Sequence, residues 1–146
     1  MTTPSLKIAG LEVSLIAMLD YDHQIDVIEG ATPRRMAGGA LFKMSAWRKH
    51  RITISAGGWV PVALNAVNYT APFEVELPMP VALRAGETLP DGWSSRAAPW
   101  AEHSVTDQAG QTVRYVYPKL TVFSSGPVQR NGFSTNPSWE ITLEQA

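Results

Sequence analysis

Alternating apolar and polar residues between Gly38 and Pro78 predict the centre of the fold. Arg51–Ser55 and Phe73–Leu77 each place apolar side chains on one side and polar ones on the other, as in strands with one buried face. Gly57-Gly58 predicts a corner between them, and the apolar run after Trp59 can cover the open end of the core. The residues expected to face inward are Ile52, Ile54, Phe73, Val75 and Leu77.

The N-terminal residues 5–16 predict a tight hairpin. Apolar residues alternate with others before and after Ala9-Gly10, a pair suited to a two-residue turn. The apolar residues from Leu11 to Leu19 also fall near helical spacing, and the hairpin is favoured over that helix.

The C-terminal third predicts strands that close the sheet. A strand over residues 112–117 is interrupted at Pro118 and resumes at Leu120–Phe123. Residues 124–136 have the composition of a turn region, with Asn131-Gly132 as a hairpin corner. The last run, Trp139–Glu144, alternates cleanly, so we expect its inward residue Trp139 to pack against Ile52 and Ile54.

Composition limits the fold and the function. The chain has 146 residues, a net charge of −1, 11 prolines, 11 glycines and no cysteine. The many turn formers favour short strands, the missing basic face argues against nucleic-acid binding, and thiolate metal sites are excluded. No apolar run reaches the roughly 20 residues of a membrane-spanning helix, and residues 1–7 lack a signal-peptide core. We therefore predict one all-β domain over residues 1–146, a sandwich or split barrel of roughly eight to ten short antiparallel strands, with a short helix near Pro61–Ala66.

The densest polar cluster lies in residues 20–29. Carboxylates and an imidazole in this cluster could bind a metal ion, but the calcium-loop pattern is missing. At strand spacing the acidic residues share one face and apolar residues the other, so a solvated strand face without metal is the preferred interpretation. The cluster consists of Asp20, Asp22, His23, Asp26 and Glu29.

Two basic segments follow this cluster. Residues Glu29–Ala37 are expected to form a connector, because Gly30 and Pro33 interrupt regular structure; its pair Arg34-Arg35 is more simply a solvated loop than an anion site. Leu41–Trp47 is expected to be a strand, and Trp47–Arg51 combines an aromatic ring with basic residues. Protection of a strand edge explains that combination better than phosphate or base binding.

Residues 82–111 differ from the rest of the chain and predict an insertion of loops with a hairpin. The turn Asp107–Gly110 joins strands expected on either side of it. The insertion has too few aliphatic residues to bury its two tryptophans, and interfaces are enriched in tryptophan and arginine. The tryptophans could form a minicore that pins the loop or an exposed contact surface. We favour the second and expect Trp93, Arg96 and Trp100 to contact a partner.

Catalysis is not predicted. His103 and the acids Asp91, Glu102 and Asp107 could be combined into an acid–base set. No nucleophile motif accompanies them, and His103 has no partner at a diagnostic spacing. No catalytic, cofactor-binding or metal-ligating residue is assigned.

Three segments taken together resemble a known family. They are Trp47–Lys49 running into Ile52–Ser55 and Gly57–Pro61, then Leu64 with Asn68–Pro72, and Tyr115–Thr121 before Ser138–Ile141. They look like small structural proteins from the tail modules of tailed bacteriophages, and more loosely like the N-terminal β-domain of distal tail proteins. The resemblance covers most of the chain from about Gly38 onward, apart from the insertion, and carries no catalytic motif.

The resemblance implies a non-enzymatic virion protein of the tail tip or baseplate, made in the host bacterial cytoplasm. Such a subunit would work as a homo-oligomer or ring, sixfold or threefold, together with other tail proteins such as the tube, hub or tape measure, without cofactor, nucleic acid or membrane insertion. The alternative is a carbohydrate- or receptor-binding β module whose exposed aromatic rings stack on sugars.

Overall fold

The computed structural model describes residues 5–13, 19–97, 102–133 and 136–146. These residues form an all-β, antiparallel structure of two sheets, so the predicted fold class is confirmed. The described part contains twelve strands, more than expected, and two of them are 17 residues long.

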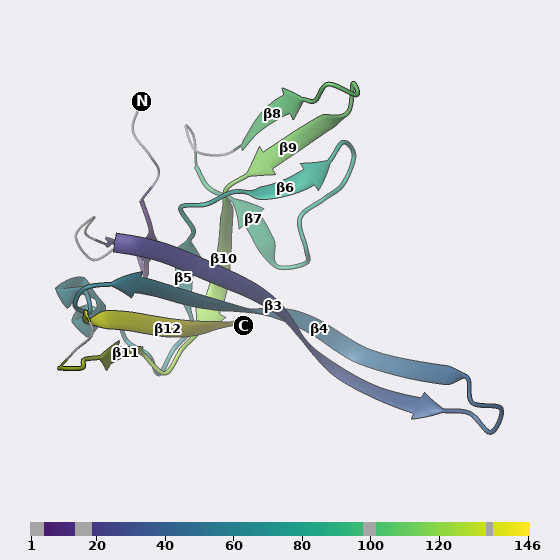
Figure 1. Cartoon of the computed structure of the whole chain (residues 1–146), viewed down its shortest axis with the longest axis horizontal. Coiled ribbons are helices and arrows are strands. Elements are labelled where there is room, and N and C mark those ends of the chain that lie inside the picture. The colour runs from purple at the N-terminus through teal and green to yellow at the C-terminus, as the bar shows by residue number, and fades with distance from the viewer. Residues whose placement is uncertain (1–4, 14–18, 98–101, 134–135) are drawn as a thin grey trace.

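The large sheet has the order β2-β1-β5-β10-β12-β4-β3, with β11 also paired to β12 and β7 to β10 (Figure 1). Its strands are β1 (Lys7–Ile8), β2 (Leu11–Glu12), β3 (Leu19–Arg35), β4 (Leu41–Gly57), β5 (Phe73–Glu76), β7 (Trp93–Ser95), β10 (Pro118–Phe123), β11 (Pro127–Arg130) and β12 (Ser138–Gln145).

The small sheet has the order β6-β9-β8 and comprises β6 (Val81–Arg84), β8 (Glu102–Thr106) and β9 (Thr112–Val116). Residues 82–84 and 102–106 of the predicted insertion belong to this sheet, whereas residues 93–95 form β7 of the large sheet. The hairpin turn expected at 107–110 is present. The strand interruption expected at Pro118 is the point where the chain passes from the small sheet to β10 of the large sheet.

The residues that form the core are those that the alternation in the sequence placed on the inward faces of the strands. The inward residues of β4, β5 and β12 are all buried, as predicted. Trp139 is 1% exposed, which confirms its burial, although its direct cross-strand neighbour is Ala56, while Ile141 and Leu143 face Ile54 and Ile52. The short 3-10 helix η2 (Val62–Ala66) lies where a helix was expected and contributes buried Leu64.

The N-terminal hairpin is confirmed in its described residues. Ala9 and Gly10 adopt positive φ angles of 54° and 80° and form the two-residue turn between β1 and β2. By contrast, β11 was not predicted, since its four residues fall in a stretch expected to be turns.

The predicted connector at Glu29–Ala37 is wrong, because β3 continues to Arg35 and pairs with β4 along its length. The separate strands expected within β4 are likewise one strand. Pro33 is tolerated because β3 is the last strand of this sheet among the described residues, and an edge position needs no N–H on its outer side. Met36 donates its N–H to the Ala40 carbonyl and closes the hairpin (2.7 Å).

Candidate functional site

The feature that stands out from the body is the distal part of the β3–β4 hairpin. Strand β12 supports β4 only as far as the pair Arg51 and Glu144. Beyond it, residues 28–49 extend away from the body as a two-stranded ribbon (Figure 1). We call residues 28–49 the arm.

The arm carries exposed apolar side chains, and none of its described side chains is fully buried. Met36 is 59% exposed, Leu41 64% and Trp47 51%. Trp47 lies across the ribbon from Gly30, and a Cβ at Gly30 would come within 2.7 Å of the Trp47 Cε2 atom. The indole ring therefore rests on the ribbon because residue 30 has no side chain.

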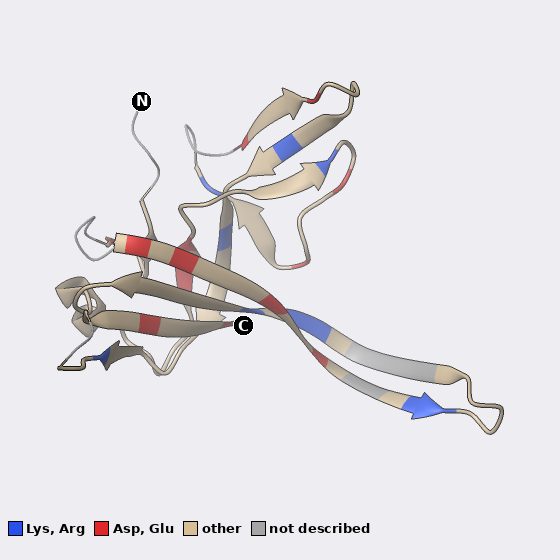
Figure 2. Ribbon diagram, in the orientation of Figure 1, with Lys and Arg blue, Asp and Glu red and all other residues tan. Residues whose placement is uncertain are grey.

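Charge is divided along β3 (Figure 2). Its first half, beside the body, carries Asp20, Asp22 and Asp26, whereas its far end carries Arg34 and Arg35. On β4, Arg48 and Lys49 add positive charge at the base of the arm, where Lys49 donates to the Ala146 carbonyl (2.7 Å). With Glu29, the charged residues of β3 are thus acidic as far as residue 29 and basic only at its end.

The polar cluster of residues 20–29 lies on β3 as a strand face. Asp20 and Asp22 are exposed, while Tyr21 and His23 on the other face are half-buried and share a hydrogen bond (Tyr21 Oη to His23 Nδ1, 2.9 Å). Burial raises the pKa of Tyr21. Burial also lowers the pKa of His23, and the negative charge of Asp22 cancels part of this lowering. Within the described ranges, no group of three or more acidic or histidine side chains is arranged to hold a metal ion.

The insertion residues chosen as partner contacts lie differently. Trp93 is half-buried against the core and meets His50 edge-on, with ring centroids 5.0 Å apart. Its indole N–H reaches Gln145 Oε1 at 3.4 Å. Trp100 lies outside the described residues.

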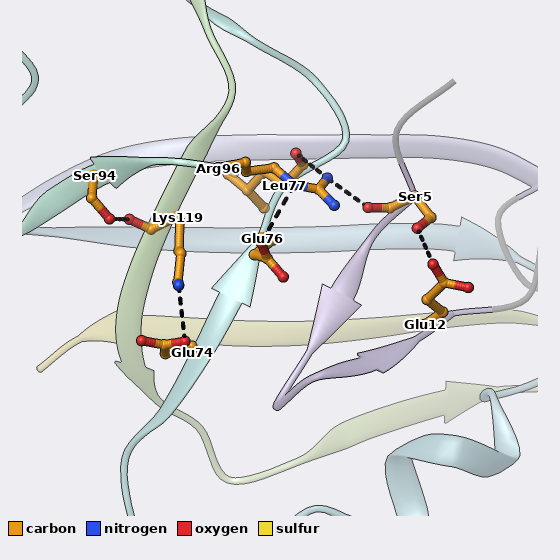
Figure 3. Close-up of polar contacts among 8 residues, drawn as sticks. All are labelled: Ser5, Glu12, Glu74, Glu76, Leu77, Ser94, Arg96 and Lys119. Atoms are coloured by element: carbon orange, nitrogen blue, oxygen red, sulfur yellow. Dashed lines mark hydrogen bonds and ion pairs between the residues drawn. The ribbon is translucent and has the colours of Figure 1, made fainter. Parts of the chain in front are cut away.

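Arg96 is only 5% exposed and is held by its own chain (Figure 3). One guanidinium nitrogen donates to the backbone carbonyls of Ser5 (2.7 Å) and Leu77 (3.1 Å), and Nε lies 3.7 Å from the Glu76 carboxylate. Glu76 was expected to face water, and this ion pair explains its partial burial. Arg96 therefore fastens the insertion to Ser5, ahead of β1, and to the end of β5, and its guanidinium is not exposed for a partner.

The residues considered for acid–base chemistry each contact different partners, and none of these contacts joins two of them. His103 stacks on Tyr115, with centroids 5.3 Å apart, and Glu102 pairs with Arg114 (3.1 Å). Asp107 accepts hydrogen bonds from two backbone N–H groups in its own turn. The Asp91 carbonyl accepts from the Gln145 side chain (2.6 Å).

The sequence did not identify the arm. The signal that could have done so is the symmetric placement of residues 19–35 and 41–57 around Gly38-Gly39, the pattern of one long hairpin.

No family model matches this sequence, and no curated protein matches it. Among the described residues, no helix is long and apolar enough to cross a membrane.

Proposed function

We propose that this chain is a structural subunit of a bacteriophage tail, at the tail tip or baseplate, and that it acts by assembly. The resemblance of the Gly57–Pro61 corner and the Tyr115–Thr121 strand to tail-module proteins supports the phage context. The observation that carries the assembly role is the arm.

An isolated two-stranded ribbon is only marginally stable in water, because it has no third strand or layer to bury its side chains. The arm nevertheless presents Met36, Leu41 and Trp47 to solvent, together with arginines. Methionine, aromatic residues and arginine are the residue types enriched where proteins meet. Contact with a partner would bury these side chains and stabilise the ribbon.

The insertion adds a second exposed element. Every residue of β8 (Glu102–Thr106) is exposed, and β8 is an edge of the small sheet in the described structure. Within the insertion, β8 is therefore a better candidate for a partner contact than Trp93 or Arg96.

The proposal is tested in the phage or prophage that carries the gene. Purified particles should contain the protein by mass spectrometry, and an antibody against it should label one end of the tail in electron micrographs. Deleting the gene should yield particles without complete tails. Absence of the protein from purified particles would refute the proposal.

The role of the arm is tested by Trp47→Ser combined with Leu41→Ser, matched against Trp59→Ser, which removes a tryptophan that is 65% exposed on the body. Both proteins should fold, since neither change touches the core. We expect the arm variant to lose incorporation into tails and the control to retain it. Equal incorporation of the two variants would show that the arm is not an assembly contact.

A further inference from the structure

The outer edge of β3 offers backbone groups to another strand. On β4, His50 donates its N–H to Gln145 Oε1 (3.1 Å) and Gly58 donates to the Pro137 carbonyl (2.8 Å), both on the side of β12. Backbone N–H and C=O groups point to alternate sides of a strand. Between His50 and Gly58, the groups of the odd-numbered residues of β4 therefore point toward β3.

The register then gives the direction of each β3 residue. Thr53 of β4 lies opposite Gln24, so Gln24 bonds inward and its neighbours His23, Ile25 and Val27 point their N–H groups outward. No described strand lies on that side of β3. This part of β3 is an open edge, the kind of surface to which another strand can pair.

The open edge has two defined ends. At one end, Asp20 has a φ of 52° and the pairing register shifts between Leu19 and Asp22. At the other end, Pro33 has the outward parity and lacks an N–H. The usable edge therefore runs from residue 23 to residue 33, and its midpoint is Ile28.

We propose that two copies of this chain pair their β3 edges antiparallel about a twofold axis at Ile28. This register places Asp22 of each copy opposite Arg34 of the other and pairs the two usable edges over their whole length. An axis at residue 26 would set Asp26 against Asp26, and an axis at residue 30 would set Asp26 against Arg34 but reduce the paired edge to residues 27–33. Each arm then lies along the body of the other copy.

This inference rests on the proposed function, because it names the partner of the arm. The test uses the purified full chain and its charge reversals Asp22→Arg and Arg34→Asp, both at exposed positions. Sedimentation velocity and native mass spectrometry should show a dimer for the natural sequence. Each single reversal places like charges opposite each other twice, so the dimer Kd should rise about tenfold.

Restored pairing separates this mechanism from misfolding. The double variant Asp22→Arg with Arg34→Asp should dimerise like the natural chain, and a mixture of the two single variants should form mainly the mixed dimer. Arg84→Asp makes the same charge change on an exposed residue of the small sheet and should leave the Kd unchanged.

Hydrogen exchange provides an independent measurement. The outward N–H groups of His23, Ile25 and Val27 should exchange slowly in the dimer and rapidly at dilutions where the chain is monomeric. A monomer at all concentrations, a larger ring, or a dimer insensitive to both reversals would overturn the twofold pairing. If the purified chain does not form this dimer, the twofold pairing is wrong, and the arm can still bind a different tail protein. If the protein is absent from virions, the proposed tail function is wrong, whatever the dimer measurements show.

Discussion

Replacing Trp139 by alanine tests whether the closing strand completes the core. Trp139 is 1% exposed and lies in the sheet between Ala56 of β4 and Gln129 of β11. Truncation removes that ring and leaves a cavity bounded by strands on both sides. Buried Trp→Ala changes cost about 3–5 kcal/mol, because lost transfer free energy and an unfilled cavity add together.

In a chain of this length, 1 kcal/mol shifts the Tm by roughly 2–4 °C, so a cost of about 3–5 kcal/mol should lower the Tm of Trp139→Ala by about 6–20 °C. Urea unfolding followed by circular dichroism should show a lower midpoint with an unchanged slope. Trp59→Ala is the matched control, since Trp59 is 65% exposed, and it should change the free energy of unfolding by less than about 0.5 kcal/mol. If the two variants melt within a degree or two of each other, the burial argument is wrong.

Three further changes test other parts of the structure. Arg96→Met should lower the free energy of unfolding by about 3 kcal/mol, because two carbonyls and Glu76 lose their partner; a change under 0.5 kcal/mol in urea unfolding would contradict this. The pKa of His23 is lowered in the folded chain, so the unfolded chain binds more protons as pH falls below about 6.5, and stability should drop there. In His23→Gln the stability should fall less over this pH range than in the natural chain. If NMR gives a titration midpoint at or above about 6.5 for His23 in the folded chain, the predicted loss of stability at low pH is wrong. Gly30→Ala should displace the Trp47 indole and speed hydrogen exchange in the arm, whereas Gly38→Ala, which meets no atom within 4 Å, should do neither.

The strands of the body were predictable because one of their faces is buried. Burial imposes alternation, and alternation in Arg51–Ser55, Phe73–Leu77 and Trp139–Glu144 identified the central strands and their inward residues. The acidic face of β3 was predicted on the same ground. The short strand β11 was missed because only half of it is shielded and it starts at a proline.

The arm could not be predicted in this way. The side chains described for the ribbon are exposed or half-buried, so no buried face imposes on them the alternation that identifies strands. Gly30 and Pro33 indicate breaks, yet Gly30 accommodates an indole and Pro33 lies at an outer edge. The partners of Arg96 were also out of reach, because Ser5 is 91 residues away in sequence and only the fold brings it close.

Ordering the arm costs conformational entropy that contacts with the body do not offset. Ordering each of its residues costs about 1–2 kcal/mol of backbone entropy, and a two-stranded ribbon offsets this with cross-strand pairs worth only about 0.2–1 kcal/mol each. Among the described side chains, the buried core of β4, β5, β10 and β12 takes no member from residues 28–49. Stability of the isolated chain therefore gives no reason for the arm's length, its exposed tryptophan or its arginines. A partner that covers the ribbon would supply the missing stabilisation, and the acidic start and basic end of β3 make a second copy of the same chain a sufficient partner.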